Sequence, residues 1–469
     1  MKKVHFIGIG GTGLSAIALM LLDRGYQVTG SDMAASTYFN AVTEHGAQTI
    51  LGHSPELATQ ADLIIRSSAI KDDDPEVLAA RAVGTPVLKR SDFLQELTAG
   101  KQTLAVAGSH GKTTTTAILI CLLDSLNLDP SFILGAEIKS LGTNSRTGSG
   151  LYFVIEADEY DYMFLGLNPT MSIITNIEHD HPDCFPTPES YAAAFKAFLL
   201  RTDPNGAVLV CADDSGVTHL LEILEETSAP VLTYGFAKGT DYQINSWSWD
   251  GHAYQFSVVY LPDKEGEEPL GCFTMSLPGK HNLSNATAAL AVIHQLGLSV
   301  EEAAKGLEHF SGTERRFDIV LDQGGVVIIN DYGHHPTQIT ATLQAARELF
   351  PEKTLWAVWE PHTFSRTEKM QAEFITSLDL ADQVLITRIY AAREVDDAYT
   401  PQSIAEALPG KKGRYLPDFG ELVDYLISNM AQNDVIVILS AGKGPQISTM
   451  LKDRLSRGGT ASTLEEAKA

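Results

Sequence analysis

Cysteine is scarce in this chain of 469 residues, and its few thiols are scattered. The four cysteines are Cys121, Cys184, Cys211 and Cys272, and their spacing fits neither a zinc site nor a disulfide framework. Long apolar runs are also missing, since no stretch approaches the roughly 20 residues of a membrane span. The first residues lack the apolar segment and small-residue cleavage site of a signal peptide. We therefore expect a reduced, cytoplasmic protein without membrane insertion.

Basic residues are the second shortage. Lys and Arg number 34 against 59 Asp and Glu, so the formal net charge is −25. This excess of negative charge argues against non-specific binding to nucleic acid or to an anionic membrane. It does not exclude a small anionic ligand, because a local loop can reverse the field. The length and the 44% of apolar residues predict an α/β protein of several domains.

A glycine fingerprint opens the chain. An apolar strand at residues 4–9 runs into Gly8-x-Gly10-x-x-Gly13, a helical pattern follows, and Asp32 comes about 20 residues later. Such a loop places a diphosphate at the end of a helix, and the acid can reach a ribose hydroxyl. Taken alone, the pattern predicts NAD. A uridine diphosphate sugar satisfies the same geometry, so both ligands remain open at this point.

A second phosphate loop follows near residue 108. An apolar strand at residues 103–107 leads into Gly108-Ser-His-Gly-Lys112-Thr113, and a helix rich in Ala, Leu and Ile begins at Lys112. A strand, glycine loop and helix in this order direct backbone N–H groups at phosphate. The loop is a variant, because Val106 stands where the usual pattern has its first glycine. We expect Lys112 to contact the phosphates and Thr113 to contact Mg²⁺.

Two clusters of acids and histidines come at later strand ends. Residues 156–161 read Glu-Ala-Asp-Glu-Tyr-Asp after one apolar strand, and residues 176–183 read Asn-Ile-Glu-His-Asp-His-Pro-Asp after another. The carboxyl ends of parallel strands gather at one edge of a sheet, and carboxylates there can hold Mg²⁺. The sequence therefore predicts a metal and phosphate site beside the loop at Lys112.

The last part of the chain repeats the alternation of strands and helices. Residues 241–277 alternate with period two and predict an antiparallel meander. From residue 315 onward, apolar strands alternate with helices, which predicts another doubly wound parallel sheet. Two of these strands end in the polar loops Asn-Asp-Tyr-Gly-His-His-Pro at 330–336 and Pro-His-Thr-Phe-Ser-Arg-Thr at 361–367.

Taken together and in order, these motifs resemble the Mur ligases. The matching stretches are His5–Gly11, Gly108–Thr113, Glu156–Glu159, Thr175–His181, Pro278–Asn282, Asp331–Pro336 and Pro361–Thr367. Members of this family form amide bonds with ATP and build the peptide of the peptidoglycan precursor. Within the family, the motifs are most similar to the type that joins L-alanine to UDP-N-acetylmuramate.

The resemblance implies an α/β fold of three domains. We expect a Rossmann-like UDP-sugar-binding domain at residues 1–99, a central P-loop ATPase-type domain that binds ATP at 100–314, and a Rossmann-like amino-acid-binding domain at 315–469. It also resolves the first loop in favour of the UDP sugar. The oligomeric state stays open.

The resemblance further implies a role for individual residues. At the UDP-sugar site it implies Gly8, Gly10, Gly11, Thr12, Gly13, Asp32, Ser67 and Ser68. At the ATP site it implies Gly108, Ser109, His110, Gly111, Lys112, Thr113, Thr114, Asn282, Arg316 and Asp331. The implied Mg²⁺ ligands are Thr113, Glu156 and His181, and the implied amino-acid contacts are Tyr332, His334 and Arg366. Lys112, His334 and Arg366 are the expected catalytic residues.

The expected reaction passes through an acyl phosphate, which the amine of L-alanine then attacks. A recycling ligase of the same superfamily, which adds a whole tripeptide to UDP-N-acetylmuramate, is the nearest alternative. An NAD-dependent oxidoreductase is a second alternative, but it leaves the loop at Lys112 and the cluster at His181 unexplained. A non-catalytic nucleotide-regulated module is a third, and it does not explain why the lysine and the metal set are intact.

Overall fold

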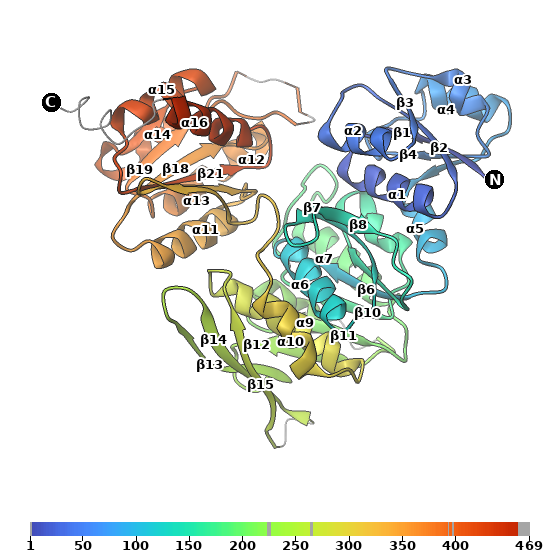
Figure 1. The fold of residues 1–469 in the computed structure, drawn as a ribbon, viewed down its shortest axis with the longest axis horizontal. Helices are drawn as coiled ribbons and strands as arrows, with labels where there is room; N and C mark the ends of the chain where they lie inside the picture. Colours follow the sequence, from blue (N-terminus) through green and yellow to red (C-terminus); the bar gives the residue numbers. More distant parts are fainter. Residues whose placement is uncertain (1, 223–226, 263–265, 393, 396–397, 458–469) are drawn as a thin grey trace. The chain divides into compact units, whose positions relative to one another are not determined.

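The computed structural model describes residues 2–222, 227–262, 266–392, 394–395 and 398–457 (Figure 1). Its residues form two compact units. The first unit comprises residues 1–249, 254–276 and 282–311, and the second comprises 250–253, 277–281 and 312–469. The first unit contains two sheets and the second contains one.

The N-terminal sheet has five parallel strands in the order β3-β2-β1-β4-β5. Its strands are β1 (Lys3–Ile7), β2 (Gln27–Asp32), β3 (Gln48–Leu51), β4 (Leu63–Arg66) and β5 (Val87–Lys89). Its helices are α1 (Thr12–Asp23), α2 (Thr37–Glu44), α3 (Pro55–Thr59), α4 (Pro75–Ala82) and α5 (Arg90–Thr98). The order 3-2-1-4 is that of a Rossmann-like fold, in which ligands bind outside the carboxyl ends of the strands.

The central sheet has ten strands in the order β15-β14-β13-β12-β11-β10-β6-β9-β7-β8. The parallel strands are β6 (Gln102–Ala107), β7 (Ser131–Ile138), β9 (Tyr152–Glu156), β10 (Met171–Ile174), β11 (Ala207–Cys211) and β12 (Val231–Gly235). Strand β8 (Thr143–Arg146) pairs antiparallel with β7 in a hairpin that the sequence analysis did not predict. The helices are α6 (Lys112–Ser125), α7 (Pro188–Leu199), α8 (Ser215–Glu222), α9 (His281–Gln295) and α10 (Val300–Glu308), with the 3-10 segment η1 (Tyr160–Gly166).

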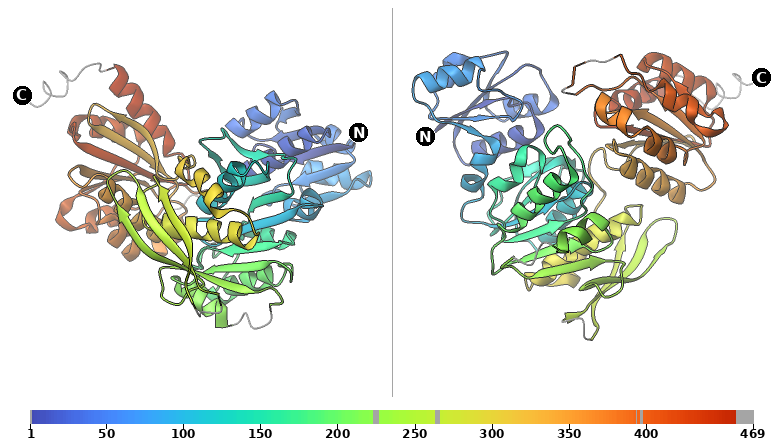
Figure 2. Two further views of the ribbon diagram at one scale, coloured as in Figure 1. Left: turned by 60° about the horizontal axis from the view of Figure 1, so that its bottom comes forward. Right: turned by 180° about the vertical axis from the view of Figure 1, so that it is seen from behind.

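The predicted antiparallel meander is present at one edge of this sheet. It consists of β13 (Tyr242–Trp249), β14 (Tyr254–Tyr260) and β15 (Glu268–Met275), which both views of Figure 2 show as a long ribbon. Apolar side chains of β13 and β14 such as Ile244, Phe256 and Val258 are buried, as the period-two pattern requires.

The second unit holds a six-stranded sheet in the order β16-β17-β21-β18-β19-β20. Its strands are β16 (Asp318–Gln323), β17 (Val326–Asp331), β18 (Thr354–Glu360), β19 (Gln383–Ile386), β20 (Gly413–Tyr415) and β21 (Asp434–Ser440). All neighbours are parallel except β16, an edge strand that the sequence analysis did not predict. The helices are α11 (Pro336–Leu349), α12 (Phe364–Lys369), α13 (Gln371–Leu378), α14 (Gln402–Ala407), α15 (Phe419–Asn429) and α16 (Pro445–Arg457), with the 3-10 turn η3 (Pro409–Lys411).

Two apolar clusters cover the two faces of this sheet. One contains Ile339 and Leu343 of α11 with Phe374 of α13, and the other contains Leu422 of α15 with Ile447 of α16. Figure 1 shows these helices on opposite sides of the strands. The predicted doubly wound arrangement is therefore confirmed.

Two further sequence predictions concern membranes and thiols. None of the described helices combines the length and apolar character needed to cross a bilayer. All four cysteines are free thiols.

Candidate active site

The loop between β6 and α6 has the geometry of a phosphate site. Gly108 has φ +136°, and a Cβ atom there would lie 2.1 Å from Thr175 Oγ1. Gly111 has φ +81°, and a Cβ atom there would lie 2.9 Å from Asn285 Oδ1. Glycine is therefore required at both positions, for backbone conformation and for space. Val106, which stands at the usual place of the first glycine, is a buried residue of strand β6 and not part of the loop.

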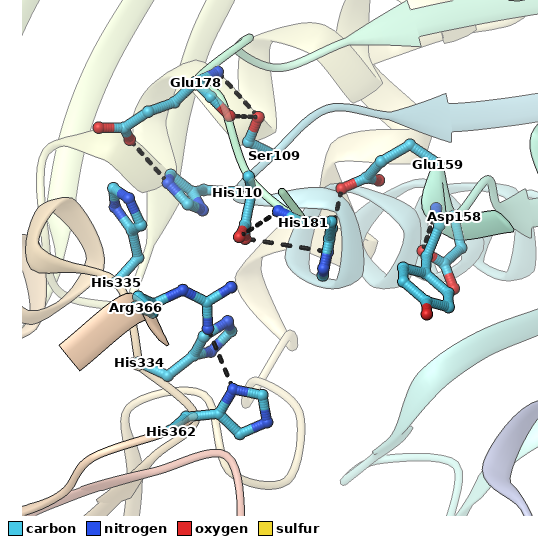
Figure 3. Close-up of polar contacts among 12 residues, drawn as sticks. Ser109, His110, Asp158, Glu159, Glu178, His181, His334, His335, His362 and Arg366 are labelled. Carbon is cyan, nitrogen blue, oxygen red and sulfur yellow. Dashed lines mark hydrogen bonds and ion pairs between the residues drawn. The ribbon is translucent and has the colours of Figure 1, made fainter. Parts of the chain in front are cut away.

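The loop is tied to the end of β10. Asn176 Oδ1 accepts a hydrogen bond of 2.8 Å from the backbone N–H of His110, and the His110 ring contacts Glu178 at 2.8 Å. Glu178 also donates its backbone N–H to Ser109 Oγ at 2.8 Å. Figure 3 shows Ser109, His110 and Glu178 grouped in this way. These contacts hold the loop in shape without using the N–H groups of residues 111–113.

Lys112 lies at the start of α6 and faces a buried carboxylate. Its Nζ is 2.8 Å from Glu159 Oε2, and only 2% of the Glu159 side chain is exposed. Burial alone would lower the pKa of Lys112, but the carboxylates of Glu159, Asp158 and Glu156 raise it above its ordinary value. Lys112 is therefore held as an ammonium ion, the form that contacts phosphate.

Thr113 and Glu156 form the oxygen pair expected at a metal site. Thr113 Oγ1 donates to Glu156 Oε1 at 3.0 Å, and Glu156 Oε2 accepts from the backbone N–H of Gly135 at 2.7 Å. A hydroxyl and a carboxylate are ligands that Mg²⁺ prefers. These two residues fit the ion. The third predicted ligand, His181, lies next to a different acid of this region: its Nε2 is 3.8 Å from Glu159 Oε1.

The four acids at the end of β9 and just after it contact different partners. Glu156 and Glu159 face the phosphate loop, as described above. Asp158 instead contacts Arg90 at 3.4 Å, and Asp161 contacts Lys89 at 3.1 Å. Lys89 and Arg90 belong to the N-terminal sheet and its last helix, so these ion pairs join the two sheets of the first unit. Among these four acids, Glu156 is the candidate metal ligand, because its carboxylate accepts a hydrogen bond from Thr113.

Asn282 lies in the first turn of α9 and is buried. It accepts a hydrogen bond of 3.0 Å from Asn285 Nδ2, and Asn285 is the residue that abuts Gly111. The sequence analysis named Asn282 but not Asn285. The spacing of three residues on a helix places both on one face, which was an available signal.

The first glycine loop follows β1 in the N-terminal sheet. Asp32 Oδ2 accepts a hydrogen bond of 2.9 Å from the Gly10 N–H, and Ser36 Oγ donates to the Gly10 carbonyl at 2.8 Å. Asp32 thus supports the loop itself. Ser67 lies against Gly8, and Ser68 is exposed.

Arg90 is a residue at this loop that the sequence analysis missed. A Cβ atom on Gly13 would lie 1.9 Å from Arg90 Nη1, so the guanidinium rests directly on the glycine. Arg90 lies far from the fingerprint in sequence, and no local pattern marks it.

In the second unit, Asp331 lies at the end of β17. Its Oδ2 accepts from the Phe317 N–H at 2.8 Å and its Oδ1 from the Gly333 N–H at 2.7 Å. Burial raises the pKa of Asp331 above its ordinary value. The guanidinium of Arg316 lies 4.7 Å from the ring centroid of Tyr332. These predicted nucleotide residues are therefore close to one another in the second unit.

The predicted amino-acid residues also come together in this unit. The ring centroids of His334 lie 5.3 Å from Tyr332 and 5.2 Å from His362. Arg366 is 7% exposed, and its Nη1 donates to His362 Nδ1 at 3.0 Å, as drawn in Figure 3. Because a guanidinium only donates, His362 Nδ1 is the acceptor and the ring carries its proton on Nε2. His362 was quoted within a motif but not named as a site residue.

Comparison with known proteins agrees with this architecture. Three family models match consecutive segments: the Mur ligase family catalytic domain at residues 3–102, the Mur ligase middle domain at 106–293, and the Mur ligase glutamate ligase domain at 315–442. The α/β fold of three domains expected from the resemblance is thereby confirmed.

Individual relatives are similar over nearly the whole chain. The UDP-N-acetylmuramate–L-alanine ligase of Caldanaerobacter subterraneus is 38% identical over 94% of this chain and 95% of its own. The solved UDP-N-acetylmuramate–alanine ligase of Thermotoga maritima is 28% identical, with a TM-score of 0.83 over 98% of this chain and 100% of its own. A murein peptide ligase of Psychrobacter arcticus is 26% identical, with a TM-score of 0.72 over 97% and 98%. The chain belongs to the Mur ligase family.

Proposed function

We propose that this protein is an ATP-dependent ligase that joins L-alanine to the carboxylate of UDP-N-acetylmuramate and releases ADP and phosphate. The likeness to L-alanine ligases over 94% of the chain supports the substrates. The observation in the structure that carries the chemistry is the phosphate loop, where the ammonium of Lys112 and the Thr113–Glu156 oxygen pair lie at the start of one helix. The likeness to the murein peptide ligase is weaker in fold, so we favour a single amino acid over the tripeptide.

Activation of the carboxylate comes first. An amine does not readily form an amide with a carboxylate, because an oxide or hydroxide ion would have to leave and is a poor leaving group. Transfer of the γ-phosphoryl group of ATP to the muramoyl carboxylate forms an acyl phosphate, in which phosphate becomes the leaving group. Lys112 and the N–H groups at the start of α6 bind the transferring phosphoryl group and offset its developing charge.

Thr113 and Glu156 would hold Mg²⁺, and His181 is the further ligand that the family resemblance implies. The ion supplies positive charge to the phosphate oxygens when it is bound. Glu156 is oriented for this by the Gly135 N–H, which occupies its other oxygen at 2.7 Å. The carboxylate is therefore positioned before any ligand arrives.

The UDP diphosphate is assigned to the first glycine loop. Gly10 and Gly13 allow the backbone to approach the phosphates, and α1 begins at Thr12 with its N–H groups unpaired within the helix. Asp32 and Ser36 fix the loop through the backbone of Gly10. Arg90, against Gly13, adds a positive charge where a diphosphate needs one.

Residues of the second unit receive the amino acid. Arg366 is suited to the carboxylate of L-alanine, because a guanidinium can bind it through two parallel hydrogen bonds. The amine must be neutral before it attacks the acyl carbon, and His334, which packs against Tyr332 and His362, is our candidate for the base. Attack gives a tetrahedral intermediate, and loss of phosphate from it leaves the amide.

One assay tests this function. Phosphate release is measured with ATP, Mg²⁺ and UDP-N-acetylmuramate, against L-alanine, other small amino acids and the murein tripeptide. We expect release that requires L-alanine and all three other components. Release with the tripeptide but not with L-alanine would replace this proposal by the recycling ligase. Reduction of NAD without any ATP turnover would replace it by an oxidoreductase.

A further inference from the structure

A buried chain of hydrogen bonds runs behind the phosphate loop and ends on Lys112. Its central member is Tyr191 of α7, which is fully buried. Tyr191 Oη donates to Glu159 Oε1 at 3.1 Å and lies 2.9 Å from Ser109 Oγ. The other oxygen of Glu159 accepts from Lys112 at 2.8 Å. None of the roles implied by the family resemblance involves Tyr191 or Glu159.

The direction of the hydrogen bond between Tyr191 and Glu159 is defined. Burial raises the pKa of the Glu159 carboxyl, and the Lys112 ammonium at 2.8 Å opposes this shift. As the carboxylate partner of that ammonium, Glu159 only accepts, so the phenol proton of Tyr191 points to it. Burial and the nearby Glu159 charge raise the pKa of Tyr191 well above its ordinary value, which keeps the phenol protonated. Ser109 accepts from the backbone N–H of Glu178 at 2.8 Å, and its own proton can reach either Tyr191 Oη or the Glu178 carbonyl.

Aromatic contacts fix the phenol in place. The Tyr191 ring packs edge to face against Phe185 and Phe195, with centroid distances of 5.1 Å and 5.0 Å. A further edge contact to His179 has a centroid distance of 6.0 Å. Because three rings pack against it, the Tyr191 ring is restricted in its movement, and its hydroxyl stays in one place. Tyr191 therefore acts as a rigid anchor for the carboxylate.

The Glu159 carboxylate holds the Lys112 ammonium at 2.8 Å. The phosphates of ATP would share this ammonium with the carboxylate, whose negative charge repels them. We propose that Tyr191 and Glu159 are positioning residues, with Tyr191 anchoring Glu159 and Glu159 holding the Lys112 ammonium at the place where the γ-phosphoryl group is transferred. This role deepens the proposed ligase function and rests on it. It predicts that ATP affinity and turnover change in opposite directions when the Glu159 charge is removed.

Two single substitutions distinguish the effect of Glu159 from that of Tyr191. Glu159→Gln keeps an acceptor for Tyr191 but removes the charge, so we expect the Kd for MgATP to fall about fivefold and kcat to fall about tenfold, since Lys112 is no longer oriented. Tyr191→Phe leaves Lys112 as the main donor to Glu159, which tightens that pair. We expect the Kd for MgATP to rise about threefold and kcat to fall about tenfold.

The double variant shows whether Tyr191 acts through Glu159. If it does, Tyr191→Phe has no further effect in the Glu159→Gln background, so the effects of the two substitutions do not multiply. Tyr242→Phe is a matched control, because Tyr242 is equally buried in the same unit and hydrogen-bonds His294 and Gln295 instead. It should leave both the Kd for MgATP and kcat unchanged.

The experiment uses the full-length protein, with calorimetric titration of MgATP and steady-state kinetics for the wild type, the two single variants, the double variant and the control. Opposite shifts in Kd for the two single variants, with a non-multiplicative double variant, support the positioning role. Weaker MgATP binding in both single variants, or multiplicative effects, would overturn it. The Kd readout needs no acceptor substrate, so loss of the wild-type reaction with L-alanine would count against the ligase function and leave the cycle readable.

Discussion

Arg366 donates a hydrogen bond from Nη1 to Nδ1 of His362 at 3.0 Å, and this contact orients a buried guanidinium within the second unit. A guanidinium can bind a planar carboxylate through two parallel hydrogen bonds.

Replacing Arg366 should affect L-alanine selectively. We expect Arg366→Ala to raise the KM for L-alanine about 100-fold or more, because a bidentate charge-assisted contact is lost. Arg366→Lys should raise it by about tenfold, since a point charge remains without the fork geometry. Steady-state kinetics with each substrate varied in turn provide the measurement. An unchanged KM for L-alanine, or an equal rise in the KM for ATP, would remove Arg366 from the amino-acid site.

Replacing Glu156 should affect the requirement for Mg²⁺. Glu156→Gln loses the charge that pairs with the ion, so we expect the half-saturating Mg²⁺ concentration to rise about tenfold or more and kcat to fall. Asp161→Asn is the matched control, because Asp161 belongs to the same acidic run but pairs with Lys89. Its Mg²⁺ requirement should equal that of the wild type. Equal shifts in both variants would indicate that the ion is not held at Glu156.

Lys112→Ala should abolish turnover and also destabilise the protein. The substitution leaves the buried carboxylate of Glu159 without its cation, and breaking such a pair typically costs about 3–5 kcal/mol. The double variant Lys112→Ala with Glu159→Gln should recover most of the stability and none of the activity. Urea unfolding and phosphate release measure the two properties. A Lys112→Ala variant as stable as the wild type would contradict the predicted cost of leaving this carboxylate without its cation.

The pH dependence of stability should include a contribution from Glu76. Glu76 and His5 are both fully buried, 2.7 Å apart. Burial alone would raise the pKa of Glu76, but hydrogen bonds from His5, Ser31 and His53 bring it below the ordinary value of 4.5. A lowered folded-state pKa stabilises the fold above the ordinary value, and this contribution is lost as the pH falls through the folded-state pKa.

Glu76→Gln tests this assignment. We expect the variant to lose about 3 kcal/mol of stability at pH 7 and to show a flatter decline than the wild type below pH 4.5. Glu96→Gln is the control, since Glu96 is an exposed partner of Lys2 and should matter little. Urea midpoints across the acid range give the comparison. Parallel acid declines in wild type and Glu76→Gln would contradict it.

Sequence patterns located the two glycine loops between strand and helix because strand, glycine and helix signals are local. The glycines at 108 and 111 mark the loop in the sequence, and in the structure both have a positive φ that favours glycine. The strand-end clusters were also located, since apolar strands followed by polar residues mark the carboxyl edge of a sheet.

Which partner each residue of these clusters contacts could not be predicted in this way. Glu156 and Asp158 are two residues apart, yet one contacts Thr113 and the other contacts Arg90 of the N-terminal sheet. In the sequence, Tyr191 is one of several aromatic and apolar residues of the helical stretch 188–199, and its hydroxyl contacts depend on how α7 packs behind the loop. The strands β8 and β16 were missed because both carry many polar residues, which hide the apolar pattern of a strand.

The most direct test of the ligase reaction follows oxygen and mass together. UDP-N-acetylmuramate labelled with ¹⁸O in its carboxylate is incubated with the protein, ATP, Mg²⁺ and L-alanine. An acyl phosphate intermediate predicts that one labelled oxygen appears in the released phosphate, and that the product has the mass of UDP-N-acetylmuramoyl-alanine with the other ¹⁸O retained in its new amide carbonyl. Unlabelled phosphate would contradict the intermediate, and a labelled product that forms only with the tripeptide would contradict L-alanine as the substrate.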